Sequence, residues 1–212
     1  MTFKLRSYQK ECLDNIYRSL RKDNKCIVVQ SPPRTGKTVI MAEIARRTTA
    51  KGNRILFIVH RKEIVDQVKK TFAEQNVKPE FCQIGMVQTF TRNINRLAKP
   101  DVILVDEAHH ALAKTYGKVL DAFPNAVKLL FTATPVRMGR LQLDQIATDI
   151  VEGKQIQELM DTGFLAPFRY FARKKIDDDK LKKSSTGDFT VGSMTDAIES
   201  GIYQAVVNEY RK

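Results

Sequence analysis

The segment VILVDEAHHA (residues 102–111) joins four aliphatic residues to a group of ionisable ones. A run of valine, isoleucine and leucine is typical of a strand that is covered on both faces, so residues 102–105 predict a buried β-strand. Ligands of parallel sheets bind at the carboxyl ends of the strands, and that is where the ionisable residues stand. The segment therefore predicts a functional site at the end of a core strand. The ionisable residues are Asp106, Glu107, His109 and His110.

The rest of the chain alternates between apolar runs and stretches with helical periodicity. Near-continuous apolar strands separated by helices predict a parallel sheet with helices on both faces, which is a three-layer αβα domain of the α/β class. The predicted strands cover residues 26–30, 54–59, 102–105 and 127–133, with a short strand entering a helix at 84–90. The predicted helices cover residues 8–20, 37–49, 63–75 and 114–123.

The composition is that of a globular protein with an excess of positive charge. The 36 Lys and Arg residues outnumber the 24 Asp and Glu residues, which leaves a net charge of +12. Such an excess favours a polyanionic partner, most often nucleic acid, although a merely soluble basic surface is the alternative. No apolar run approaches the roughly 20 residues of a membrane span, so no membrane partner is expected.

The amino-terminal sequence and the cysteines indicate a cytoplasmic protein. The start, MTFKLRSYQK, lacks the apolar stretch of a signal peptide. Three cysteines at wide spacing, Cys12, Cys26 and Cys82, argue against a disulfide framework or a zinc site.

The segment SPPRTGKT (residues 31–38) follows a predicted strand and opens a predicted helix. This is the setting of a phosphate-binding loop, in which backbone amides and a helix N-terminus face phosphate oxygens. Lys37 would reach the β- and γ-phosphates, and the Thr38 hydroxyl would bind Mg²⁺. The alternative is a helix-capping turn that happens to contain a lysine.

Asp106 and Glu107 complement this loop, because two strands of a parallel sheet can be neighbours and bring their ends together. Asp106 would hold Mg²⁺ through water, and Glu107 would orient and deprotonate the attacking water. Buried carboxylates are costly unless a cation matches them, and Lys37 and Mg²⁺ provide that match.

DEAH (106–109), with SPPRTGKT before it and TATP (132–135) after it, closely resembles the superfamily-two helicases and translocases. LRSYQ (5–9) resembles their adenine-reading Q-motif, VHRKEIVDQ (59–67) resembles motif Ia, and QTF (88–90) the strand-contact motif that follows. The resemblance covers residues 1–172 and implies a RecA-like P-loop NTPase lobe that uses ATP and Mg²⁺. In style, DEAHHALAKTY and LAPFRYFA are similar to phage and restriction-type DNA helicases.

The resemblance assigns a role to each motif residue. The nucleotide would be bound by Arg6, Gln9, Ser31, Pro32, Pro33, Arg34, Thr35, Gly36, Lys37 and Thr38. The catalytic set would be Lys37, Asp106, Glu107 and His109, with Thr38 and Asp106 at the metal. Nucleic acid, with DNA favoured over RNA, would contact Arg61, Gln88 and Thr89. Thr132 and Thr134 would couple the nucleotide state to nucleic-acid grip through His109, whereas His110 is expected to be a surface or packing residue.

Some of these residues also suit a purely structural role, and the chain departs from the family pattern in places. Arg61 also suits a solvated helix start, and the TATP hydroxyls also suit a turn cap. Ser31 stands where the general pattern has glycine, and Arg34 stands where helicases commonly have glycine. The stretch between motif Ia and QTF is shorter than usual, which predicts a lost hairpin or strand.

The expected organisation is one lobe, residues 1–172, followed by a charged linker and an amphipathic helix, residues 173–212. Complete members of the family have a second RecA-like lobe that supplies arginine fingers, and nothing after Ala172 resembles its motifs. A lone first lobe would bind ATP weakly and hydrolyse it slowly. The competing hypotheses are a stand-alone module that binds nucleic acid or a partner, and a compact P-loop kinase.

Overall fold

The computed structural model describes residues 4–108, 114–134 and 143–168, together with residues 182, 190 and 192–195. One compact unit, Met1–Arg137 with Leu141–Leu165, carries the sheet. Ala166–Lys212 belong to a second unit, which is described at only a few residues. The predicted linker and final helix lie almost wholly outside the described residues, so the boundary after Ala172 stays a prediction.

Six strands form one sheet in the order β3-β2-β4-β5-β1-β6, and all their pairings are parallel. The strands are β1 (Cys26–Gln30), β2 (Ile55–Val59), β3 (Cys82–Met86), β4 (Val102–Val105), β5 (Val127–Thr132) and β6 (Asp149–Glu152). The helices are α1 (Ser7–Arg21), α2 (Lys37–Ala50), α3 (Lys62–Glu74), α4 (Val87–Arg92), α5 (Lys114–Ala122) and α6 (Ile156–Asp161). The predicted α/β class with a parallel sheet is confirmed.

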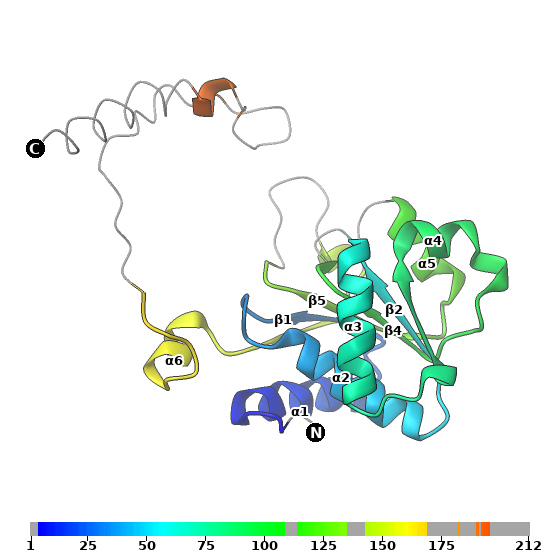
Figure 1. Ribbon diagram of the computed structural model, residues 1–212, viewed down its shortest axis with the longest axis horizontal. Coiled ribbons are helices and arrows are strands. Elements are labelled where there is room, and N and C mark those ends of the chain that lie inside the picture. The colour runs from blue at the N-terminus through cyan, green and yellow to red at the C-terminus, as the bar shows by residue number, and fades with distance from the viewer. Residues whose placement is uncertain are drawn as a thin grey trace, which may run out of the picture. The chain divides into compact units, whose positions relative to one another are not determined.

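Helices cover both faces of the sheet (Figure 1). Successive strand residues point to opposite faces, so a continuous apolar strand needs a cover on each face. On one face Val29, Phe57 and Leu104 pack against α1, α2 and α3 in one core cluster. On the other face Leu56 and Leu130 pack against α4 and α5 in a second cluster. None of the described helices is long and apolar enough to span a membrane.

Strand β6 and helix α6 have no counterpart among the predicted elements. The sequence of β6 gives a weak signal because only Val151 of its four residues is buried. Tertiary contacts hold β6 against β1, and α1 secures it from the side. The Ser19 hydroxyl donates to the Asp149 carboxylate, which also accepts a hydrogen bond from the Asn24 amide at 3.3 Å.

Gly153 follows β6 at a point where backbone segments come close together. Its N–H donates to the Gln30 carbonyl oxygen at 2.8 Å, and a Cβ at this position would stand 2.8 Å from the same oxygen. The residue after Gln30 begins the SPPRTGKT loop, so the absence of a side chain at Gly153 allows β6 to close against the base of that loop.

Gly153→Ala is expected to lower the free energy of unfolding by about 1–3 kcal/mol, because the backbone must move to admit the methyl group. Gly117→Ala is the matched control, since its Cβ would meet only the Asp121 carboxylate, at 3.9 Å, within α5. The control should raise the stability by about 0.5–1 kcal/mol, the usual gain from replacing a helical glycine. Urea titration of both variants measures the difference, and equal effects would contradict the close approach.

The three cysteines are free thiols held within the packed unit. Burial raises the pKa of Cys82 to about 12, and burial with the Glu11 charge raises that of Cys12 to about 11. Burial also raises the pKa of Cys26.

Iodoacetamide at pH 8 is expected to alkylate Cys12 and Cys82 of the native chain at least about a hundredfold more slowly than the same thiols of the urea-unfolded chain, because only the thiolate reacts. Folding raises these pKa values, so the stability that they contribute is complete at neutral pH. That contribution declines as pH rises above the unfolded-chain value of about 8.5. Mass spectrometry of timed samples measures alkylation, and rapid native modification of Cys12 or Cys82 would contradict the burial.

Candidate functional site at the carboxyl edge of the sheet

Every predicted site residue that the structure describes lies at the carboxyl edge of the sheet or beside it on α1. In strand order, β3 is followed by Gln88 and Thr89, and β2 is followed by Arg61. β4 is followed by Asp106 and Glu107. Thr132 ends β5, and the SPPRTGKT loop follows β1. The parallel sheet therefore places motifs that are far apart in sequence along one edge.

The SPPRTGKT loop turns sharply into α2. Gly36 caps the helix in the left-handed region with a φ of 78°, and no side chain caps the helix. Among the described residues, no hydrogen bond is donated by the backbone N–H groups of residues 34–38. A helix N-terminus with unpaired amides is a binding site for an anion, so the loop fits a phosphate chain.

Hydrogen bonds between side chains and backbone within the loop fix its shape. The Thr35 hydroxyl, 1% exposed, donates to the Pro32 carbonyl oxygen at 2.7 Å and lies 2.7 Å from the Ser31 hydroxyl. Ser31, which replaces the usual glycine, thus contributes a hydrogen bond that glycine lacks. Arg34 is solvent-exposed and adopts a φ of 63°, a left-handed conformation that costs a residue with a side chain about 1–2 kcal/mol.

Helix α1 holds the loop from the other side. The Gln9 amide and the Tyr8 hydroxyl both donate to the Thr35 carbonyl oxygen, at 3.0 and 2.9 Å. The Gln9 side-chain oxygen accepts from the Arg6 N–H at 3.0 Å. A Cβ on Gly36 would stand 2.5 Å from the Gln9 amide nitrogen, so the glycine allows this approach. Gln9 thus lies against the loop, and its contact with the nucleotide stays a prediction.

Aromatic contacts behind Gln9 were not predicted from the sequence. The Tyr8 and Phe164 rings meet edge to face with centroids 4.9 Å apart, and the Arg6 guanidinium lies 5.7 Å from the Phe164 ring centroid. Phe164 follows α6, an element with no prior prediction. No local pattern marks such a contact, because it joins residues from opposite ends of the unit.

Lys37 and Glu107 meet across the sheet edge. Lys37 Nζ lies 3.4 Å from Glu107 Oε1, and the side chains are 12% and 38% exposed. The expectation that their strands are neighbours is wrong, since β5 lies between β1 and β4. The two side chains span that intervening strand, so the loop and the DEAH segment still share one site.

The backbone turns directly after β4, at Asp106 and Glu107. The Asp106 N–H donates to the Ile58 carbonyl oxygen of β2 at 3.0 Å, which continues the sheet by one residue. Glu107 then takes a left-handed φ of 51°, and its N–H donates to Asp106 Oδ1 at 3.0 Å. Such strain commonly marks functional sites.

Helix α5 carries a buried phenol close enough to Asp106 to be affected by its charge. Tyr116 of α5 is 2% exposed, and its hydroxyl has no hydrogen-bond partner among the described residues. Burial, with the Asp106 charge second, raises the pKa of Tyr116 to about 12. This residue was not predicted from the sequence, where it reads as a core position of an amphipathic helix.

Thr132 connects β5 to the loop. Its carbonyl oxygen accepts the Ser31 N–H at 2.9 Å, and its buried hydroxyl exchanges hydrogen bonds of 3.2 Å with the backbone of Thr134. The hydroxyl thus caps the turn, which was the structural alternative for the TATP hydroxyls. The backbone of Thr132 connects the TATP segment to the phosphate-binding loop. His109, His110 and Pro135 lie outside the described residues.

Arg61, Gln88 and Thr89 have exposed side chains at the ends of two neighbouring strands. Arg61 is the N-cap residue of α3, and Gln88 and Thr89 lie in the first turn of α4. The structure therefore brings the predicted nucleic-acid residues together, on the side of Asp106 away from the phosphate-binding loop.

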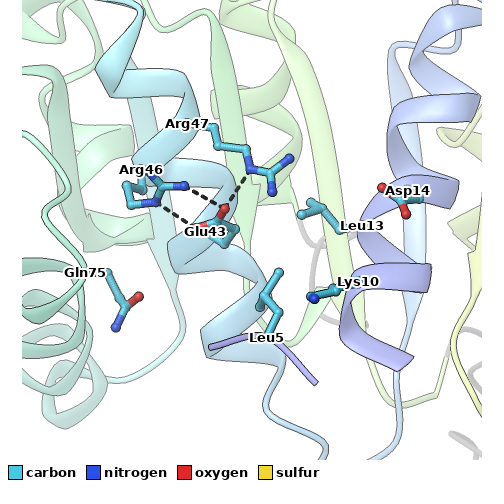
Figure 2. Close-up of a pocket in the computed structure, with 8 residues that line it drawn as sticks. All are labelled: Leu5, Lys10, Leu13, Asp14, Glu43, Arg46, Arg47 and Gln75. Carbon is cyan, nitrogen blue, oxygen red and sulfur yellow. Dashed lines mark hydrogen bonds and ion pairs between the residues drawn. The ribbon is translucent and has the colours of Figure 1, made fainter. Parts of the chain in front are cut away.

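An ion-pair cluster on the other flank of α2 stands apart from these residues. Figure 2 shows Arg46 and Arg47 both directed at Glu43, each with a hydrogen bond of 2.7 Å, in a pocket of about 480 Å³ between α1 and α2. The Arg46 hydrogen bond, followed by that of Arg47, lowers the pKa of Glu43 despite its burial. None of the predicted site residues lines this pocket.

Two protein-family models match this chain. Residues 2–137 match the family described as Type III restriction enzyme, res subunit, and residues 79–200 match the SWI2/SNF2 ATPase family. A 51.5 kDa protein of Lactococcus phage (isolate 7-9) is 37% identical over 185 residues, which are 87% of this chain and 41% of that protein. The chain spans less than half the length of the curated relatives it matches.

Solved structures share the fold at low sequence identity. The UvsW helicase of bacteriophage T4 superposes with a TM-score of 0.56 at 17% identity, over 71% of this chain and 60% of that one. The Type ISP restriction-modification enzyme LlaGI, solved with a DNA substrate mimic, gives 0.61 at 15% identity, over 76% of this chain and 21% of that one. This chain belongs to the family of the Type III restriction enzyme res subunit, and its sheet-bearing unit is a lobe of the superfamily-two helicase type.

Proposed function

We propose that this lobe binds ATP with Mg²⁺ and couples its hydrolysis to movement on DNA, as a DEAH-box member of its superfamily. The 3.4 Å approach of Lys37 to Glu107 carries the proposal, because it joins the phosphate-binding loop to the DEAH carboxylates in one site. The net charge of +12 favours a polyanionic partner, and the LlaGI neighbour was solved with a DNA mimic.

Each residue at the loop would have a separate role in nucleotide binding. The N–H groups of residues 34–38, which donate to no acceptor in the part of the chain that the structure describes, would donate to phosphate oxygens, and the Lys37 ammonium would exchange Glu107 for a phosphate. Glu107 would then be released to orient and deprotonate water. Thr38 would bind Mg²⁺ through its hydroxyl and Asp106 would hold it through water, and the ion would compensate phosphate charge.

The distal part of the edge would contact the nucleic-acid backbone. Arg61, Gln88 and Thr89 are exposed together beside Asp106 and carry donors suited to phosphate oxygens. The hydrogen bond from the Ser31 N–H to the Thr132 carbonyl oxygen joins the TATP segment to the phosphate-binding loop. We propose that the TATP segment responds to the bound nucleotide through this connection and through His109. A second RecA-like lobe would complete the motor.

Lys37→Ala is expected to weaken the binding of a fluorescent ATP analogue by about 10- to 100-fold, the loss of one charge-assisted contact. Glu107→Gln should leave that affinity within about threefold and slow ATP turnover by about 10²-fold or more, because it removes the base. Fluorescence titration and phosphate release, with and without single-stranded DNA, measure the two quantities.

Lys51→Ala is the matched control, because Lys51 is an exposed lysine at the opposite end of α2 and should change neither quantity. Unchanged ATP affinity in Lys37→Ala would refute the nucleotide site. DNA binding that ignores ATP and both site variants would instead support the stand-alone binding module. In either case DNA binding should fall steeply with salt and be weakened by Arg61→Ala.

The wild-type loop is expected to bind ATP despite Arg34, with an affinity no more than about tenfold below that of Arg34→Gly. Arg34 already adopts the left-handed conformation that a glycine would take there. Arg34→Gly therefore leaves the shape of the loop unchanged and relieves backbone strain of only about 1–2 kcal/mol. Titration of both proteins with labelled ATP tests this. Binding by the glycine variant alone would show that Arg34 has disabled the loop.

A further inference from the structure

A groove of about 620 Å³ lies between α3 and the edge strand β3. It takes in the connection from α3 to β3, which enters the strand at its amino end. The lining residues are Lys69, Phe72, Ala73, Asn76, Val77, Lys78, Pro79, Cys82 and Ile84. The proposed site follows the carboxyl ends of the strands, so the groove is separate from it.

The groove has an apolar floor and a cationic rim. Phe72 and Val77 are 3% and 6% exposed and pack into the core, while Cys82 and Ile84 are half-buried along β3. Lys69 and Lys78 are solvent-exposed. No carboxylate is among the lining residues, so an occupant with apolar side chains and negative charge would match the groove.

The adjoining strand has an open edge. β3 pairs with β2 on one side, and among the described residues no strand pairs with its other side. An exposed strand edge presents unpaired N–H and C=O groups that another extended chain can bond. The groove therefore combines side-chain pockets with a row of backbone partners.

The wall of the groove is preformed. After α3 ends at Glu74, Asn76 adopts a left-handed φ of 57°, and the Val77 N–H donates back to the Phe72 carbonyl oxygen at 3.0 Å. The Lys78 N–H is held by the Thr49 hydroxyl of α2 at 3.2 Å. A preformed wall lowers the entropy that binding would cost.

The geometry points to a protein-docking site, in which an extended segment of a partner adds a strand to β3. Alternate apolar side chains of the segment, roughly 7 Å apart, enter the groove, and flanking Asp or Glu residues pair with Lys69 and Lys78. Nucleic acid fits poorly, because it would cover an apolar floor with phosphates. A second copy of the chain fits poorly too, since it brings the same lysines and a net charge of +12.

A random decapeptide library displayed on phage, selected on the full chain, tests the chemistry of the occupant. The expected consensus has apolar residues at every second position with Asp or Glu beside them. The synthesised consensus peptide is then titrated by fluorescence anisotropy into wild type and variants. Ala73→Glu, at an exposed position, places a negative charge in the groove, and Lys69→Glu with Lys78→Glu reverses the rim.

Both groove variants should weaken the peptide by about tenfold or more, whereas Lys70→Glu, an exposed α3 lysine outside the groove, should change it less than about twofold. Thermal unfolding confirms that each variant is folded. The proposal would be overturned if no peptide is enriched, or if the consensus is rich in Lys or Arg or has its apolar residues at helical spacing. Peptide binding that survives Ala73→Glu would also overturn it. So would a dimer of the chain, or DNA binding, that Ala73→Glu abolishes.

Discussion

The proposed site depends on one contact, the approach of the Lys37 ammonium to the Glu107 carboxylate across the end of β5. A partly buried carboxylate is costly unless a cation lies beside it, and a partly buried lysine has the same need. The sheet satisfies both by placing the two segments on either side of one intervening strand. The parallel pairings of β5 with β1 and β4 set this distance, so the packing of a strand that contributes neither residue decides the geometry of the site.

Local strain supports the same arrangement. Arg34 and Glu107, which both carry a Cβ, have positive φ, and they lie in the loop and beside it at the end of β4. Such conformations persist only where the surroundings fix them, and here Gln9, Thr35 and the edge of the sheet do so. The open amides that result make the site suitable for an anion. The residues that line the groove at β3 include none of the proposed site residues.

The short, continuous apolar runs and the periodic helices of the sequence determined the α/β class, five of the six strands of the sheet and the chain order of the motifs. They did so because burial on two faces and a period of 3.6 residues are local properties of a chain. The residues of the loop and of the DEAH segment were identifiable for the same reason, since each motif is contiguous. Strand β6 escaped prediction because a polar edge strand with one buried residue lacks such a signal.

Only the tertiary structure decided the strand order, with β5 between β1 and β4, and the contacts that join distant segments. Tyr8 with Phe164, and Gly153 against Gln30, connect residues whose separation in sequence carries no information about their distance. The groove beside β3 is likewise a property of packing, because it exists where a helix and a strand edge leave space between them. Sequence specifies what each segment can do, and the sheet determines which segments meet.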